Sequence, residues 1–206
     1  MSPPSLESDV FCDRADIERD EAPHAANSVE WWYATGLLND VETGDTFGIE
    51  FVVFHFSMSS KKERLLSNVG ITDVSADRFY FDHTHVGLED QLEAILPLQL
   101  STDRRKSKAS MLGQFREYSF IANAHHEGES FYYSLKTKPT SPLVFHGNNT
   151  GYEDYGGYAK ASYYSYTDLT TEDEIEVDGK LRKVKGSIWC DRQWNCGSVL
   201  QNRTTG

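Results

Sequence analysis

The sequence predicts a single all-β domain, an antiparallel barrel or sandwich with little helix. Runs rich in β-branched and aromatic residues alternate with turn residues, with a break about every ten positions. Asp178-Gly179 separates two such runs and is a strong signal for a two-residue hairpin. The 206 residues are enough for one domain with a hydrophobic core, and no repeat suggests a solenoid.

The expected elements follow an irregular, acidic N-terminal segment over residues 1–28, and the β domain then runs over 29–206. A short helix is predicted over 87–96, because Leu88, Leu92, Ile95 and Leu96 follow helical spacing and Pro97 ends it. We expect strands over 29–38, 46–57, 66–74, 78–81, 115–124, 130–138, 158–169, 175–177 and 181–189.

The net charge of −12 argues against a nucleic-acid partner or an anionic membrane surface, because like charges repel. The one basic run, residues 104–108, is expected to be a solvated loop. No apolar run is long enough to span a bilayer, and no signal peptide is visible at Met1. We therefore expect a soluble chain, cytoplasmic as written, or secreted or periplasmic if already processed.

Cysteine and histidine spacing predicts neither a disulfide framework nor a metal centre. Cys12, Cys190 and Cys196 are odd in number and irregularly spaced, which favours free thiols. Two histidine pairs, 83/85 and 125/126, lack the third protein ligand that a catalytic zinc site needs. Surface or hydrogen-bonded histidines are the preferred interpretation, and we expect no metal and no cofactor.

Two tryptophan-bearing segments, one early and one late, carry the candidate chemistry. Glu30 precedes Trp31 and Trp32, and Asp191-Arg192 lies between Trp189 and Trp194. If the segments meet in the sheet, a buried carboxyl group beside tryptophan would have a raised pKa and could donate a proton. The alternative is an ion pair of Arg192 with Glu30 and Asp191 that only closes the end of the barrel.

Aromatic residues in these segments and in a later tyrosine-rich strand could line a site for a ring-containing or polyene ligand. Ordinary strand packing is the alternative, and the pattern alone does not choose between them. The candidate ligand-binding residues are Trp31, Trp32, Tyr33, Tyr164, Tyr166, Trp189 and Trp194.

Several motifs resemble the AttH/CrtC-type lipocalin-like family, which includes carotenoid hydratases and is similar to fungal cyclases that fold a polyene. The matching segments are Glu30-Trp-Trp-Tyr-Ala-Thr-Gly-Leu37, Thr46–Phe54, Ile71–Asp73, Phe145-His-Gly147, Ser162–Tyr166, Val177-Asp-Gly179 and Gly186–Trp194. The resemblance implies a lipocalin-like barrel. Two departures matter: Arg192 stands where the hydratases carry histidine, and the chain ends where family members continue into a second barrel half. The chain is thus expected to be the N-terminal half of a two-barrel protein or a shortened relative.

Three functional hypotheses remain open. In the first, the domain belongs to a hydratase- or cyclase-like enzyme for a hydrophobic, isoprenoid- or polyene-like small molecule. Asp191 would then be the acid, Glu30 and Arg192 would position it, and aromatic faces would stabilise a carbocation. In the second, the barrel binds an apolar ligand without changing it. In the third, side chains fill the barrel and its role is structural.

Overall fold

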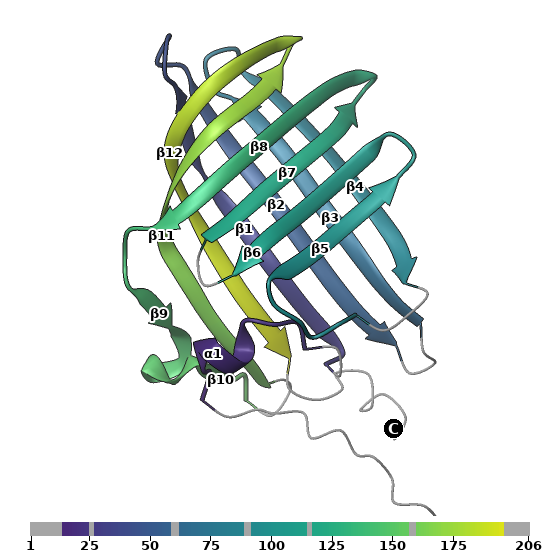
Figure 1. Ribbon diagram of the computed structural model, residues 1–206, viewed down its shortest axis with the longest axis vertical. Helices are drawn as coiled ribbons and strands as arrows, with labels where there is room; N and C mark the ends of the chain where they lie inside the picture. The colour runs from purple at the N-terminus through teal and green to yellow at the C-terminus, as the bar shows by residue number, and fades with distance from the viewer. Residues whose placement is uncertain are drawn as a thin grey trace, which may run out of the picture.

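The computed structural model describes residues 14–24, 27–58, 62–88, 92–114, 117–156 and 160–195, and these build one antiparallel sheet curled into a nearly closed barrel (Figure 1). The helical segments are α1 (Ile17–Asp20) and the short turn η1 (Gly147–Gly151). The strands are β1 (Val29–Asp40), β2 (Thr46–Met58), β3 (Lys62–Asp73), β4 (Arg78–Leu88), β5 (Leu98–Arg104), β6 (Ser107–Gln114), β7 (Glu117–His126), β8 (Glu129–Pro139), β9 (Leu143–Phe145), β10 (Tyr152–Asp154), β11 (Lys160–Val177) and β12 (Lys180–Asn195).

The first and last long strands lie side by side, so the two tryptophan segments meet as predicted. The strand order is β4-β3-β2-β1-β12-β11-β8-β7-β6-β5, with β9 and β10 both paired to β11. In the β1–β12 ladder, Glu30 lies opposite Trp194 and Trp32 lies opposite Arg192. The free edges of the sheet are not at this junction but at β4 and β5.

Hydrogen bonds from side chains, rather than a backbone ladder, join β3 and β4 to β5, β6 and β7. We call the line along which these strands meet the seam. Ser67 and Thr102 share a 2.6 Å hydrogen bond between β3 and β5. The Asp82 carboxylate on β4 accepts hydrogen bonds from the Ser107 hydroxyl and, at 3.1 Å, from the backbone N–H of His125. These contacts hold the edges together without strand pairing.

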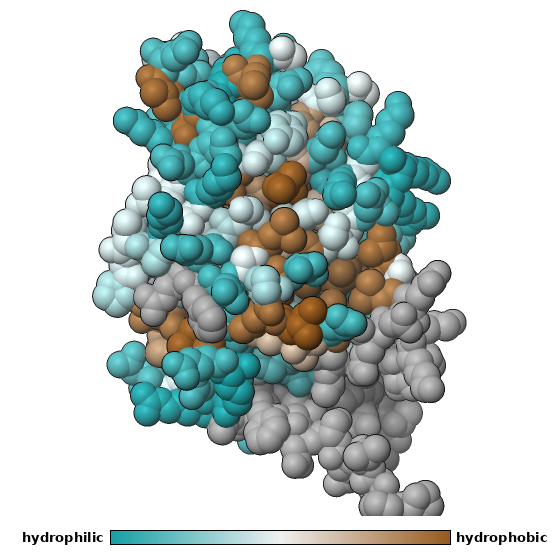
Figure 2. Space-filling view, viewed as in Figure 1, coloured by the Kyte–Doolittle hydropathy of each residue, from teal (hydrophilic) through white to brown (hydrophobic). Residues whose placement is uncertain are grey.

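Alternation along the strands sends every second side chain into a packed interior. Phe51 and Phe120, from strands on different walls, meet edge to face with ring centroids 5.2 Å apart. Tyr133 donates a hydrogen bond of 2.9 Å to the carbonyl of Glu50. The middle of the barrel is therefore filled by side chains from both walls. The view in Figure 2 shows the outer surface, where hydrophilic side chains gather at both ends and apolar ones lie mainly across the middle of the face.

The predicted helix over 87–96 is wrong, at least over its described residues. Gly87 and Leu88 end β4, and residues 92–97 form an irregular connection to β5. Leu88, Leu92 and Leu96 all pack against the core, so their spacing reflects burial of an extended chain rather than one helix face. The β5–β6 hairpin was not predicted. Its turn is Arg105-Lys106, which lies in the basic run that was expected to be a loop.

The Asp178-Gly179 hairpin is confirmed. Val177 pairs with Lys180, and both turn residues have positive φ, 54° for Asp178 and 65° for Gly179, as a type I′ turn requires. No helix in the described part of the chain has the length and apolar character needed to cross a membrane.

Candidate functional site

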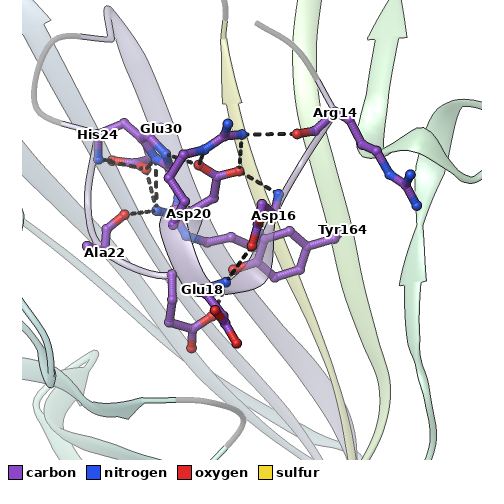
Figure 3. Close-up of polar contacts among 11 residues, drawn as sticks. Arg14, Asp16, Glu18, Asp20, Ala22, His24, Glu30 and Tyr164 are labelled. Carbon is purple, nitrogen blue, oxygen red and sulfur yellow. Dashed lines mark hydrogen bonds and ion pairs between the residues drawn. The ribbon is translucent and has the colours of Figure 1, made fainter. Parts of the chain in front are cut away.

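The N-terminal residues 14–24, which we call the strap, close one end of the barrel (Figures 1 and 3). Asp16 caps α1, because its carboxylate accepts a 3.0 Å hydrogen bond from the backbone N–H of Glu18. The Asp20 carboxylate in turn accepts from the N–H of Asp16 at 2.7 Å and from the Arg19 guanidinium. Although the sequence analysis predicted an irregular lead-in, the strap thus has a specific structure that buries Asp20 and Glu21.

Glu21 inserts its carboxylate among three tyrosines of the inner wall. Tyr164 and Tyr166 on β11 donate to its Oε2 at 2.9 and 3.0 Å, and Tyr118 on β7 donates to its Oε1. Burial, together with the neighbouring Glu21 carboxylate, raises the pKa of all three phenols. They therefore remain neutral donors that hold the strap in place.

Glu30 and Arg192 form a buried ion pair beside the strap. Their side chains are 0% and 3% exposed, and the Arg192 Nη2 contacts Glu30 Oε1. The guanidinium lies 4.1 Å above the ring of Trp32 and 5.2 Å from that of Trp194, within the range of cation–π attraction. Arg192 Nη2 also donates to the carbonyl of Ala22 in the strap at 3.0 Å.

His24 of the strap completes this centre from the other side. Its backbone N–H donates to Glu30 Oε2 at 2.9 Å, and its Nδ1 lies 2.7 Å from Glu30 Oε1. Its Nε2 lies 3.4 Å from Asp20, and its ring stacks on Trp194 with centroids 4.2 Å apart. An imidazole that carries protons on both nitrogens can donate to both carboxylates. Figure 3 shows Asp20, His24 and Glu30 gathered at this point.

A fully buried histidine, His55, extends the centre onto β2. Its Nε2 lies 3.1 Å from Glu63 Oε2, and its Nδ1 lies 4.0 Å from Glu30 Oε2. Glu63 also accepts a 2.7 Å hydrogen bond from the backbone N–H of Leu92. A row of polar groups therefore runs from the strap through Glu30 and His55 to Glu63.

The protonation state of Glu30 follows from its neighbours. Burial alone raises the pKa of this carboxyl group, but the Arg192 charge and the hydrogen bonds from His24 oppose the shift, and the net effect lowers the pKa. Glu30 is therefore a carboxylate at neutral pH. It can accept a proton or stabilise positive charge, but it does not meet the expectation of a neutral acid.

Four nitrogen atoms at this centre are buried and have no hydrogen-bond partner among the described residues. They are Trp32 Nε1, His55 Nδ1, and Nε and Nη1 of Arg192. Buried donors are almost always satisfied, because each unmet one costs about 1–3 kcal/mol. A ligand hydroxyl or a water molecule from outside the described residues is the straightforward way to satisfy them, because it can accept from the N–H groups of Trp32 and Arg192 and donate to the Nδ1 of His55.

Asp191 lies apart from Glu30 and Arg192, since consecutive residues of a strand face opposite sides of the sheet. On the outer face its carboxylate accepts hydrogen bonds from Trp189 Nε1, at 2.6 Å, and from the hydroxyl of Ser165. His146 Nε2 lies 2.7 Å from the same hydroxyl, and its ring stacks on Tyr163. The hydroxyl stands between imidazole and carboxylate, whereas in a nucleophilic triad the imidazole stands between the other two.

The structure thus divides the predicted site residues by strand alternation. Glu30, Arg192, Trp32, Tyr164, Tyr166 and Trp194 are buried on the inner face, and Trp31, Tyr33, Trp189 and Asp191 lie on the outer one. The predicted grouping of Asp191 with Glu30 and Arg192 is corrected accordingly. Sequence reasoning missed Glu21, His24, His55 and Glu63. Only His55 left a usable signal, since it alternates in phase with Phe51 and Val53.

Metal ligation has no support in the described ranges, where no three His, Cys, Asp or Glu side chains converge on one point. Cys190 is a buried free thiol on the inner face of β12. Cys12 and Cys196 lie outside the described residues, as does the tyrosine-rich strand's first predicted residue, Tyr158.

The chain is similar to known proteins over nearly all of its length. The model of a family described as AttH-like matches residues 13–206. A crystal structure of an AttH protein from Nitrosomonas europaea superimposes with a TM-score of 0.71 at 20% identity, covering 98% of this chain and 60% of that one. Kievitone hydratase from Nectria haematococca superimposes with a TM-score of 0.58 at 12% identity, covering 90% of this chain and 53% of that one. No curated protein matches the sequence. The chain therefore has a fold found in these structures and spans little more than half of their length.

Proposed function

The chain belongs to the AttH-like family, and from this premise we propose that its barrel binds a hydrophobic, isoprenoid- or polyene-like small molecule beside the Glu30–Arg192 pair. The observation that carries the proposal is the set of buried nitrogen atoms that have no hydrogen-bond partner among the described residues, namely the N–H donors of Trp32 and Arg192 and the Nδ1 of His55. Once the strap moves, the face of Trp194 that His24 covers in this structure would contact the apolar body of the ligand, and the N–H donors of Trp32 and Arg192 would bind an oxygen at its end.

The strap covers this end of the barrel, so we expect it to move when a ligand enters. Glu21 and His24 bind wall residues through hydrogen bonds and one aromatic stack, without a covalent link. Such contacts can be exchanged for contacts with a ligand. Entry from the strap side also avoids the middle of the barrel, where Phe51 and Phe120 meet.

The test compares two neighbouring tryptophans of β1 that face opposite sides of the sheet. Retinol, an isoprenoid polyene alcohol, serves as the probe, and its fluorescence reports binding. Trp32→Phe keeps an aromatic ring but removes the inner N–H donor, so retinol affinity should fall about tenfold, the value of one hydrogen bond. Trp31→Phe on the outer face is the matched control and should leave the affinity unchanged.

Two results would contradict the proposal. One is an equal effect of Trp31→Phe and Trp32→Phe; the other is equal affinity for retinol and for a polyene hydrocarbon that has no oxygen. In either case the inner donors would not recognise the ligand. A thermal melt of each variant separates weaker binding from weaker folding.

A second candidate is a hydratase- or cyclase-like reaction on the same ligand, which the charge distribution favours. A His24 imidazolium would give its Nδ1 proton to one carbon of a C=C bond, and the Glu30 carboxylate would take a proton from the water molecule that adds to the other carbon. That proton would return to His24 across their 2.7 Å contact, which restores both groups. The structural likeness to kievitone hydratase agrees with this candidate but carries only the fold. Incubation with an acyclic polyene in isotopically heavy water, followed by mass spectrometry, should give a labelled adduct that Glu30→Gln abolishes and Asp191→Asn does not.

A further inference from the structure

A second candidate site lies on the seam, away from the strap. Here β4 faces the β5–β6 turn and the end of β7 across a pocket of about 680 Å³. Three histidines and three cationic residues line it: His83, His85, His125, Arg104, Arg105 and Lys106. In Figure 1 the β5–β6 turn points away from α1, and hydrophilic side chains gather over this end in Figure 2. This pocket therefore plays no part in the proposed apolar site.

The charge of the pocket is opposite to that of the protein. The chain carries a net charge of −12, with 32 acidic residues, yet Arg104, Arg105 and Lys106 form no salt bridge with any carboxylate in the described ranges. The next cation along the chain, Lys108, is paired with Asp103 at 3.6 Å. Three neighbouring, exposed cations that form no salt bridge within the described ranges can attract an external anion, even in a protein rich in acids.

The one carboxylate that lines the pocket, Asp82, accepts three hydrogen bonds from groups of the seam. Asp82 accepts hydrogen bonds from the Ser107 hydroxyl and from the backbone N–H groups of His83, at 2.7 Å, and His125, at 3.1 Å. These bonds hold it in the seam as a structural bridge between β4, β6 and β7. Its single negative charge offsets only one of the three cations in the lining, so the pocket keeps a net positive charge.

Three details distinguish this pocket from an ordinary solvated turn. His125 Nδ1 is buried and has no hydrogen-bond partner within the described structure. Arg105 occupies a turn position with φ of 59°, where glycine or asparagine would be less strained. The Arg104 guanidinium is oriented by His85, whose Nε2 and carbonyl oxygen lie 3.1 and 3.4 Å from its Nη1. Turn stability therefore does not explain an arginine at position 105. The contacts with His85 orient the Arg104 side chain in the lining of the pocket.

We propose that this seam pocket binds the phosphate group of a small molecule. Guanidinium groups pair with phosphate oxygens through two parallel N–H bonds, and a dianion matches several cations better than a monocarboxylate does. The histidine rings add further donors around the same space.

The experiment uses isothermal titration calorimetry of the full chain with inorganic phosphate, a phosphomonoester and acetate as probes. Arg104→Gln/Lys106→Gln should weaken phosphate binding at least about tenfold. Lys138→Gln/Lys185→Gln removes the same two charges from exposed positions on β8 and β12, and should change the affinity less than about twofold. Preference for the phosphomonoester over inorganic phosphate would assign the site to an organic phosphate; the reverse preference would assign it to the free ion.

Backbone amide NMR of the unmodified protein provides a second readout that does not depend on a variant folding. Phosphate should shift the resonances of residues 82–85, 104–107 and 125 before any others. The proposal is overturned by the absence of phosphate binding, by acetate binding as tightly as phosphate, by equal weakening in both double variants, or by shifts that map elsewhere.

Discussion

At the residue scale, the buried pair of Glu30 and Arg192 is the feature on which both stability and function depend. Arg192→Leu leaves the Glu30 carboxylate buried without its main counter-charge, which should lower the free energy of unfolding by about 3–5 kcal/mol. The control is Lys183→Leu, which breaks the exposed 2.8 Å pair with Glu174 and should cost less than about 1 kcal/mol. Urea unfolding measures both.

The double variant Glu30→Leu/Arg192→Leu separates burial of a charge from loss of packing. It removes both charges together, so it should recover a substantial part of the stability that Arg192→Leu loses. If the double variant were less stable than Arg192→Leu, the unpaired carboxylate would not be the cause of the loss.

The site residues that lie on strands could be predicted from the sequence, whereas those that lie on the strap could not. The two tryptophan motifs located Glu30 and Arg192 correctly, but Asp191 was grouped with them although alternation places adjacent residues on opposite faces. Glu21 and His24 lie in a segment with no periodicity. Their partners are tyrosines and acids that are distant in the chain or reached through an irregular turn, so no local pattern could reveal them.

At the element scale, the close approach of β1 and β12 depends on glycine. A Cβ on Gly36 would meet the carbonyl oxygen of Ser187 and lie 2.7 Å from Ile188 Cα, so a backbone would have to shift. We expect Gly36→Ala to lower the free energy of unfolding by about 1–3 kcal/mol. Gly87→Ala on β4 is the control, since a Cβ there meets no atom within 4 Å and its effect should be within about 1 kcal/mol of zero. Equal effects of the two substitutions would show that the β1–β12 contact tolerates a side chain.

The strand elements were also easier to predict than the connections between them. Strong β-forming runs identified β1, β2, β7 and β8 near their observed limits, whereas the strand expected over 181–189 continues as β12 to Asn195. The β5–β6 hairpin was missed because polar residues dominate its sequence and its turn is basic. The leucines of residues 87–96 follow helical spacing and therefore suggested a helix. In the structure the same spacing arises because an extended, irregular segment packs leucines against the core.

At the scale of the whole molecule, the barrel carries two chemically different ends. The strap end combines aromatic rings with a buried ion pair, and the seam near the opposite end combines cations with histidines. Because no backbone ladder joins β4 to β5, groups at the seam can bind a ligand without interrupting strand pairing. The amino-acid composition shows only that the chain carries a net negative charge. It does not show that cations gather at the seam.

Because the barrel buries several tyrosine phenols, its stability should depend on pH in the alkaline range. Burial raises the pKa of Tyr118, Tyr133, Tyr164 and Tyr166 well above the ordinary value, and the neighbouring Glu21 carboxylate raises it further for all but Tyr133. Above about pH 10 the unfolded chain loses these protons while the folded protein keeps them. Stability is therefore fully present below that pH and falls as the pH rises.

Four such groups give a slope of up to about 5 kcal/mol per pH unit, or about 1.4 kcal/mol for each proton. Urea unfolding at several pH values around 10, with tyrosinate absorbance recorded at each, measures both the slope and the ionisation. Tyr133→Phe should reduce the slope by one proton, because it removes one phenol that donates only to the carbonyl of Glu50. If all tyrosines ionised near pH 10 while the protein stayed folded, the phenols would not be shielded, and the hold of Glu21 and its tyrosines on the strap would have to be weaker than the hydrogen bonds indicate.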